Sequence, residues 1–137
     1  MKPEVFELKV PAEVDKLQDV LDFTDALLEE NSCPMKAMMH IDIALEELFV
    51  NIANYAYPES KGEALIRVRV TPEYAEITLI DSGIPYDPLA KPDPDITLSA
   101  EKRKIGGLGI FMSKKLMDDI VYEYSDGKNI LTIKKLF

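Results

Sequence analysis

The sequence is poor in cysteine and histidine, with one of each among its 137 residues. A lone cysteine, Cys33, cannot form an internal disulfide and fits a reducing compartment. The lone histidine, His40, has no cysteine or second histidine near it in the sequence. A zinc site or a histidine-based catalytic triad is therefore not expected.

Long apolar runs and an excess of positive charge are also missing. No run approaches the ~18–20 apolar residues that span a bilayer. Residues 1–7 lack the apolar stretch of a signal peptide, which predicts a cytoplasmic protein without a membrane partner. The net charge of −9 argues against nucleic-acid binding, because a phosphate backbone requires a basic surface. A phosphate ligand would need a local positive feature, such as a helix N-terminus, a divalent cation or a small basic cluster.

The remaining composition is that of a globular protein, with 47% hydrophobic and 30% charged residues. The length predicts one domain, residues 1–137, with a sizeable core. Apolar periodicity predicts strands at residues 5–10, 64–70, 74–80, 120–124 and 130–136, and helices from about Pro11 to residue 30, at 35–57 and at 110–117. This order predicts an α+β fold: a two-layer sandwich with a mostly antiparallel five-stranded sheet and three helices on one face.

The predicted helix 35–57 combines an apolar face with a narrow polar line. Its apolar residues share one side at about 100° per residue, namely Ile41, Leu45, Leu48 and Ile52. Glu47, Asn51 and Asn54 follow at i, i+4 and i+7 and form an adjacent stripe. A carboxylate one turn from a carboxamide is suited to holding a metal and activating a hydroxyl. Taken alone, the stripe is more typical of solvated helix residues.

A second pattern, Asp81-Ser82-Gly83, stands where a predicted strand ends. An aspartate there can accept a hydrogen bond from an exocyclic amine. Gly83 would let the backbone pass close to a planar ring, where a Cβ would collide. An ordinary turn is the alternative interpretation of these residues.

A third pattern is a glycine-rich entrance to the helix at 110–117, formed by Gly106, Gly107 and Gly109. Glycines free backbone N–H groups to face an anion, and the helix dipole adds to the attraction. The densest basic cluster of the chain precedes them directly, namely Lys102, Arg103 and Lys104. The pattern is not a Walker A motif, and a solvated loop is the alternative interpretation of the cluster.

Together the three motifs resemble the GHKL, or Bergerat-fold, ATPases, and among these the bacterial anti-sigma-factor serine kinases. The resemblance implies ATP and Mg²⁺ as cofactors, Glu47 as the general base and Asn51 as the magnesium ligand. It implies that Asp81 recognises adenine and that a lid from about Tyr86 to Lys104 closes over the nucleotide. The implied cofactor-binding residues are Asn51, Asp81, Gly83, Tyr86, Arg103, Lys104, Gly106, Gly107, Leu108 and Gly109.

The resemblance also implies three partners: a STAS-type anti-anti-sigma protein as the phosphorylated substrate, a sigma factor as the alternative ligand, and a second copy of the chain. The sequence departs from the family where Ile105 replaces an arginine before the second glycine box. A non-catalytic ATP-binding regulatory module of the same fold therefore stays open as an alternative. The catalytic domain of a histidine kinase is a weaker one, because no helix pair carries a phospho-accepting histidine.

Overall fold

The computed structural model describes residues 4–90 and 107–137. Its elements follow the expected order. They are β1 (Val5–Pro11), the 3-10 turn η1 (Val14–Lys16), α1 (Leu17–Glu30), α2 (Met35–Tyr55), β2 (Glu63–Val70), β3 (Tyr74–Asp81), the 3-10 turn η2 (Pro88–Ala90), α3 (Gly107–Leu116), β4 (Asp119–Ser125) and β5 (Lys128–Leu136).

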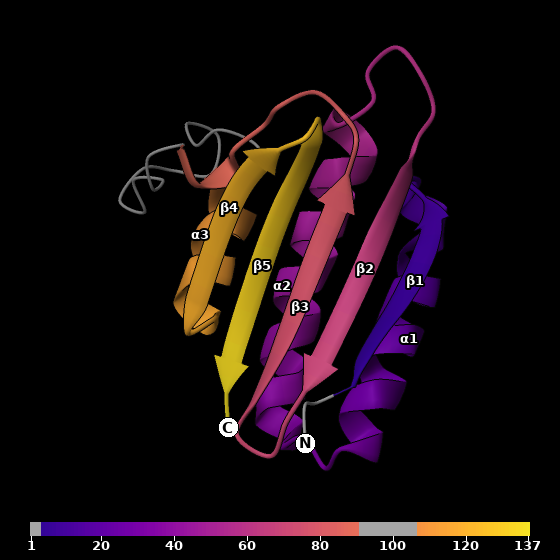
Figure 1. Ribbon diagram of the computed structural model, residues 1–137. Helices are drawn as coiled ribbons and strands as arrows, with labels where there is room; N and C mark the ends of the chain where they lie inside the picture. The colour runs from indigo at the N-terminus through magenta and orange to yellow at the C-terminus, as the bar shows by residue number, and fades with distance from the viewer. Residues whose placement is uncertain (1–3, 91–106) are drawn as a thin grey trace.

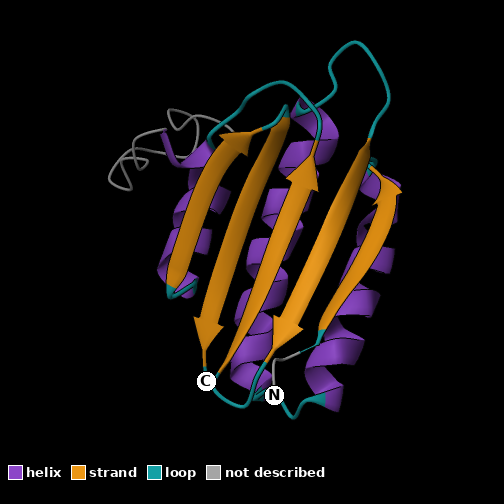
Figure 2. Cartoon of the chain, in the orientation of Figure 1, coloured by secondary structure: helices purple, strands orange, loops and turns teal. Residues whose placement is uncertain are grey.

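The five strands form one sheet in the order β1-β2-β3-β5-β4, and every neighbouring pair is antiparallel. The three helices lie on one face of this sheet, with α1 behind β1 and β2, α2 across the centre and α3 behind β4 (Figure 1). Figure 2 shows the two layers, strands in front and helices behind. The predicted α+β sandwich is confirmed, and its sheet is antiparallel throughout.

The core lies between α2 and the three central strands. Ile41, Leu45 and Leu48, predicted on the apolar face of α2, are each at most 2% exposed. They pack in one cluster with the inward-facing residues of the strands, among them Ile66, Val68, Ile77, Leu79 and Ile133. Within the described residues, no helix is long and apolar enough to cross a membrane.

Two predicted helix ends were wrong. Pro11 does not open the first helix but ends β1, an edge strand whose position tolerates the missing N–H. α2 ends at Tyr55 instead of residue 57. Tyr57 lies beyond the helix, where its side chain forms hydrogen bonds with two other segments of the chain. The Tyr57 hydroxyl donates to the Glu63 carbonyl at 2.7 Å and accepts from the Ser82 N–H at 2.8 Å.

Two further boundaries differ from the prediction. The turn between β4 and β5 is shorter than expected, since Asp126 and Gly127 both have positive φ, 54° and 76°. This conformation fits a two-residue hairpin, which extends both strands. The third helix is longer, since α3 begins at Gly107. Gly107 and Gly109 therefore belong to its first turn rather than to a loop before it.

A pair of carboxyl groups lies between α1 and α2. Asp25 and Asp42 are half-buried, and the Oδ1 atom of each is buried without a hydrogen-bond donor when both groups are ionised. Burial, a hydrogen bond with Asp25 and the charge of Asp25 together raise the pKa of Asp42 to about 8. A proton on Asp42 supplies the missing donor, so the folded chain holds a proton there at neutral pH.

This pair predicts a loss of stability at alkaline pH. In the unfolded chain an aspartate titrates near pH 4, so the free energy of unfolding should fall as pH rises from about 4 through the folded pKa of about 8. In Asp42→Asn the amide donates permanently and this fall should shrink. Melting temperatures measured between about pH 5 and pH 9 check the expectation.

Asp22→Asn is the matched control, because it removes one exposed acid from the same helix as Asp25. Its melting temperature should retain the pH dependence of the parent chain. Parallel curves for the parent, Asp42→Asn and Asp22→Asn would contradict the shared proton.

Candidate functional site

The C-terminal half of α2 and the adjoining ends of β3 and β5 enclose a small pocket. Its lining is mostly apolar with a few polar side chains, namely Leu48, Asn51, Ile52, Ala56, Leu79, Asp81, Ile84, Tyr86, Pro88, Asn129 and Leu131. Three of the predicted site residues, Asn51, Asp81 and Tyr86, therefore meet here. The pocket volume is about 40 Å³, far below the roughly 300–1,000 Å³ of ligand sites. A pocket of this volume is too small for a nucleotide base.

Asp81 ends β3 with its carboxylate inside this pocket, only 5% exposed. Its Oδ1 atom accepts hydrogen bonds from the Gly83 N–H and from the Asn129 side-chain amide, both at 2.9 Å. A carboxylate accepts about four hydrogen bonds over its two oxygens. The group is thus held in place through one oxygen and retains capacity for an amine donor on the other.

Asn129 organises the same wall, and sequence reasoning gave it no role. Its Oδ1 atom accepts from the Tyr122 hydroxyl and from the Tyr86 N–H, the latter at 3.1 Å. Its Nδ2 atom donates to Asp81 and, at 2.8 Å, to the Ile84 carbonyl. All four hydrogen-bonding positions of the amide are therefore used. The sequence signal was available: Asn129 occupies an inward strand position two residues before the buried Leu131.

Glu47 and Gly109 come together although 62 positions separate them in the sequence. A Cβ added to Gly109 would overlap the Glu47 carboxylate, so the predicted base rests directly on the first turn of α3. Burial, and secondarily the charge of Glu46, raise the pKa of Glu47. The first N–H groups of a helix have no partner within the helix. The carboxylate is consequently placed beside backbone donors that suit a phosphate.

Asn51 lies one turn after Glu47 and is 9% exposed. Its Nδ2 atom is buried and has no hydrogen-bond partner among the described residues. Rotation of a side-chain amide exchanges the positions of its oxygen and nitrogen. The Asn51 side chain can therefore turn its oxygen toward a ligand. Mg²⁺ takes oxygen donors and is commonly held by one or two protein groups plus phosphates and water. Asn51 fits that role, since its buried amide has an unsatisfied position and lies one helical turn from Glu47.

Gly83 has a structural reason that the sequence did not reveal. A Cβ at this position would overlap the backbone carbonyl of Ala56, at the end of α2. The same carbonyl accepts a hydrogen bond from the Ile84 N–H at 2.9 Å. The helix end is thus a close neighbour of Gly83, and the approach of its backbone to a ligand ring stays a prediction. This contact fixes the start of the pocket wall against α2.

The other predicted site residues are placed as follows. The Tyr86 ring lies 6.1 Å from the Tyr55 ring, centroid to centroid. Asn54, on the same stripe as Glu47, is exposed. The backbone of Gly107 and Leu108 forms the start of α3. The predicted Arg103, Lys104 and Gly106 lie outside the described residues, as does most of the expected lid.

Known proteins resemble this chain over nearly its whole length. The family of histidine kinase-like ATPase domains matches residues 10–135. The serine-protein kinase RsbW of Bacillus cereus (strain AH187) is 27% identical over 135 residues, covering 96% of this chain and 84% of that protein. The serine-protein kinase RsbW of Bacillus mycoides (strain KBAB4) is 28% identical over 137 residues, covering 97% of this chain and 86% of that protein.

A solved structure shares the fold. The structure of the RsbU and RsbW domains of Rv1364c from Mycobacterium tuberculosis matches with a TM-score of 0.68 at 15% identity. The match covers 97% of this chain and 32% of that longer chain. At this identity the likeness concerns the arrangement of helices and strands.

The contacts of Gly83 and Gly109 predict different effects of an added methyl group on stability. Gly109→Ala should displace the flexible end of Glu47 and leave the fold intact, so the melting temperature should change little while the carboxylate moves. Gly83→Ala forces a Cβ against the Ala56 backbone, which cannot yield cheaply, and should destabilise the chain by about 1–3 kcal/mol. Thermal unfolding of both variants checks the difference. Equal losses of stability would contradict the contacts described.

Proposed function

The chain belongs to the histidine kinase-like ATPase domain family, and from this membership we propose that it is an ATP-dependent serine protein kinase acting as an anti-sigma factor. One observation supports the catalytic part of the proposal most directly. The Glu47 carboxylate rests on Gly109 in the first turn of α3. This contact supports Glu47 as the general base, because the base would then lie beside backbone N–H groups that suit the transferred phosphate.

In the proposed reaction, the Oγ atom of a substrate serine attacks the γ-phosphorus of ATP. Glu47 accepts the serine proton as the new oxygen–phosphorus bond forms. The bond from the γ-phosphorus to its bridging oxygen breaks, and ADP leaves with the bonding electrons. Mg²⁺, when bound at Asn51, would neutralise charge on the phosphates.

The adenine end of the proposed site rests on the hydrogen-bonded wall. Asp81 would accept the exocyclic amine of adenine, and Asn129 would keep the carboxylate oriented. Gly107, Leu108 and Gly109 would offer backbone N–H groups to the phosphates, with Arg103, Lys104 and Gly106 contributing from outside the described residues. Tyr86 would pack at the mouth of the pocket, where the lid begins.

The proposed partners follow from the relatives that carry the name serine-protein kinase RsbW. The protein substrate would be a STAS-type anti-anti-sigma protein, and the alternative ligand a sigma factor. A cytoplasmic location belongs to the same proposal, because ATP and the transcription machinery meet in that compartment. A homodimer is proposed from the family resemblance. ATP binding without phosphoryl transfer would instead indicate a nucleotide-dependent regulatory module.

Glu47→Gln tests the proposed base. The amide keeps the size of the side chain but accepts no proton, so phosphoryl transfer should fall by about 10²–10⁴-fold. ATP affinity should stay within a few-fold of the parent. Transfer is measured with labelled ATP and a purified STAS partner encoded by the same genome, and affinity by calorimetry. The matched control is Glu46→Gln, which alters the exposed neighbouring carboxylate. A native rate in Glu47→Gln would remove this residue from the mechanism.

The raised pKa of Glu47 predicts the pH dependence of the rate. Only the ionised carboxylate accepts a proton, so activity should decline as pH falls through the pKa of Glu47. That decline should lie above the usual glutamate value of about 4.3, because burial raises this pKa. Glu46→Gln removes a neighbouring charge that contributes to the rise and should move the decline to lower pH. A decline that stays in place in Glu46→Gln would contradict the assignment.

A further inference from the structure

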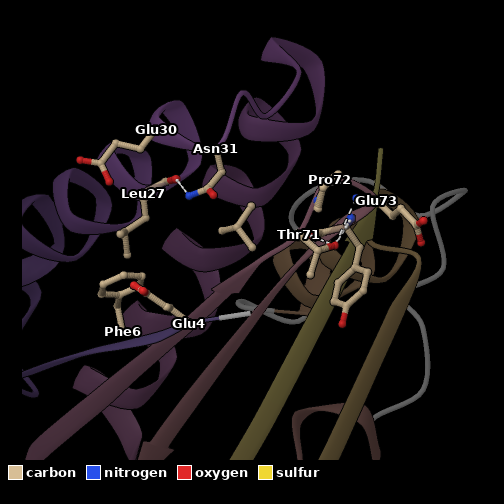
Figure 3. Close-up of a pocket in the computed structure, with 10 residues that line it drawn as sticks. Glu4, Phe6, Leu27, Glu30, Asn31, Thr71, Pro72 and Glu73 are labelled. Carbon is tan, nitrogen blue, oxygen red and sulfur yellow. Dashed lines mark hydrogen bonds between the residues drawn. The ribbon is translucent and has the colours of Figure 1, made fainter. Parts of the chain in front are cut away.

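A second and larger recess lies at the opposite end of the sheet from the nucleotide pocket. We call it the acidic groove and define it by Glu4, Phe6, Leu27, Glu30, Val70 and Glu73, which lie among the residues that line it. Its volume is about 630 Å³, within the usual range of about 300–1,000 Å³ for ligand sites. Figure 3 shows Phe6 and Glu4 on one side, Leu27, Glu30 and Asn31 above them, and residues 71–73 across the opening.

The apolar floor of the groove exists because the helix layer stops before the sheet does. Phe6, Leu8 and Val10 all point from β1 toward the helices, since they pair with the inward-facing Val68, Ile66 and Ala64. Val10 is 6% exposed, Leu8 is half-buried and Phe6 is 39% exposed. α1 ends at Glu30, so the ring of Phe6, at the end of this row, remains partly uncovered by the helices.

The rim of the groove is negatively charged, and its carboxylates have no compensating cation among residues 4–90 and 107–137. Glu4, Glu30 and Glu73 are exposed, and none of them forms a salt bridge with another residue in 4–90 or 107–137. Among the described residues, no lysine or arginine lines the recess. The Lys134 ammonium lies 4.3 Å from the ring centre of Tyr74, which also lines it. Exposed carboxylates around an apolar floor attract a ligand that is both cationic and apolar.

The rim is also held in shape by local hydrogen bonds. The Thr71 hydroxyl accepts from the N–H groups of Glu73 and Tyr74, each at 3.1 Å, which fixes the turn between β2 and β3. The Asn31 side chain donates to the Leu27 carbonyl at 2.8 Å, which closes the end of α1. Both walls of the groove are thus formed before any ligand arrives, so ordering them on binding costs little.

We propose that the acidic groove binds a lysine- or arginine-bearing amphipathic segment of a protein partner. An apolar side chain of the segment would cover Phe6 and Leu27, and its cations would pair with Glu4, Glu30 and Glu73. The charge of the rim favours this occupant over the other macromolecules. Anionic lipid and nucleic acid would be repelled, and a second copy of this chain carries a net charge of −9.

The position of the groove makes its occupancy independent of the nucleotide. β3 runs from Tyr74 at the groove to Asp81 at the pocket, eight residues or about 24 Å. A segment in the groove therefore leaves the pocket open, and the proposal does not rest on kinase activity. A partner would be held by the groove whether or not ATP is bound.

The test measures fluorescence anisotropy of a labelled amphipathic leucine–lysine peptide titrated with the full chain. The groove variant carries Glu4→Gln, Glu30→Gln and Glu73→Gln. Loss of three exposed ion pairs should weaken peptide binding about tenfold, and Phe6→Ala should weaken it about as much through lost apolar burial. A saturating non-hydrolysable ATP analogue should change the affinity less than twofold.

The matched control carries Glu13→Gln, Glu59→Gln and Glu123→Gln, three exposed acids outside the groove. It changes the net charge equally and should bind the peptide like the parent. Equal weakening in both triple variants, equal binding of a leucine–glutamate peptide, or competition by the ATP analogue would overturn the proposal. So would sedimentation showing that the chain self-associates and that Phe6→Ala abolishes it, because the groove would then be a contact between copies.

Discussion

The side-chain amide of Asn129 is the interaction on which the proposed nucleotide pocket depends. It joins the start of β5 to the end of β3 through Asp81, to the following segment through Ile84 and Tyr86, and to β4 through Tyr122. A buried amide with every position satisfied is rigid, because any movement leaves a donor or acceptor unpaired. The Asp81 carboxylate inherits that rigidity. An unliganded chain can therefore keep an acceptor poised in a pocket that is still too small for a base.

Much of this architecture was predictable from the sequence. Period-2 and period-3.6 patterns placed the strands and helices, and the three motifs predicted a family that the match over residues 10–135 confirms. Element ends were less predictable where side chains from elsewhere intervene, as at Tyr57. The contact between Glu47 and Gly109, the shared proton of Asp25 and Asp42 and the hydrogen bonds of Asn129 were not predictable. Each depends on how distant segments dock, which local periodicity does not encode. The roles of the predicted site residues stay predictions.

Two demands meet on α2 and explain its composition. One side must fill the core and is wholly apolar where Ile41, Leu45 and Leu48 meet the sheet. Polar side chains lie on its two flanks. Glu47 and Asn51 lie on the side that faces α3 and the pocket, and Asp42 lies on the side that faces α1. A single helix therefore carries the core residues, the proposed base and the protonated Asp42.

The position of β5 in the sheet has a consequence for how the chain becomes functional during synthesis. β5 follows every other strand in the sequence yet lies between β3 and β4. Until it emerges from the ribosome, β4 has no partner and the inner edge of β3 is open. Asn129 arrives with it, so a nascent chain that already contains Glu47, Asn51 and Asp81 still lacks the residue that orders the pocket. The residues of the proposed site are therefore brought together only once β5 has joined the sheet.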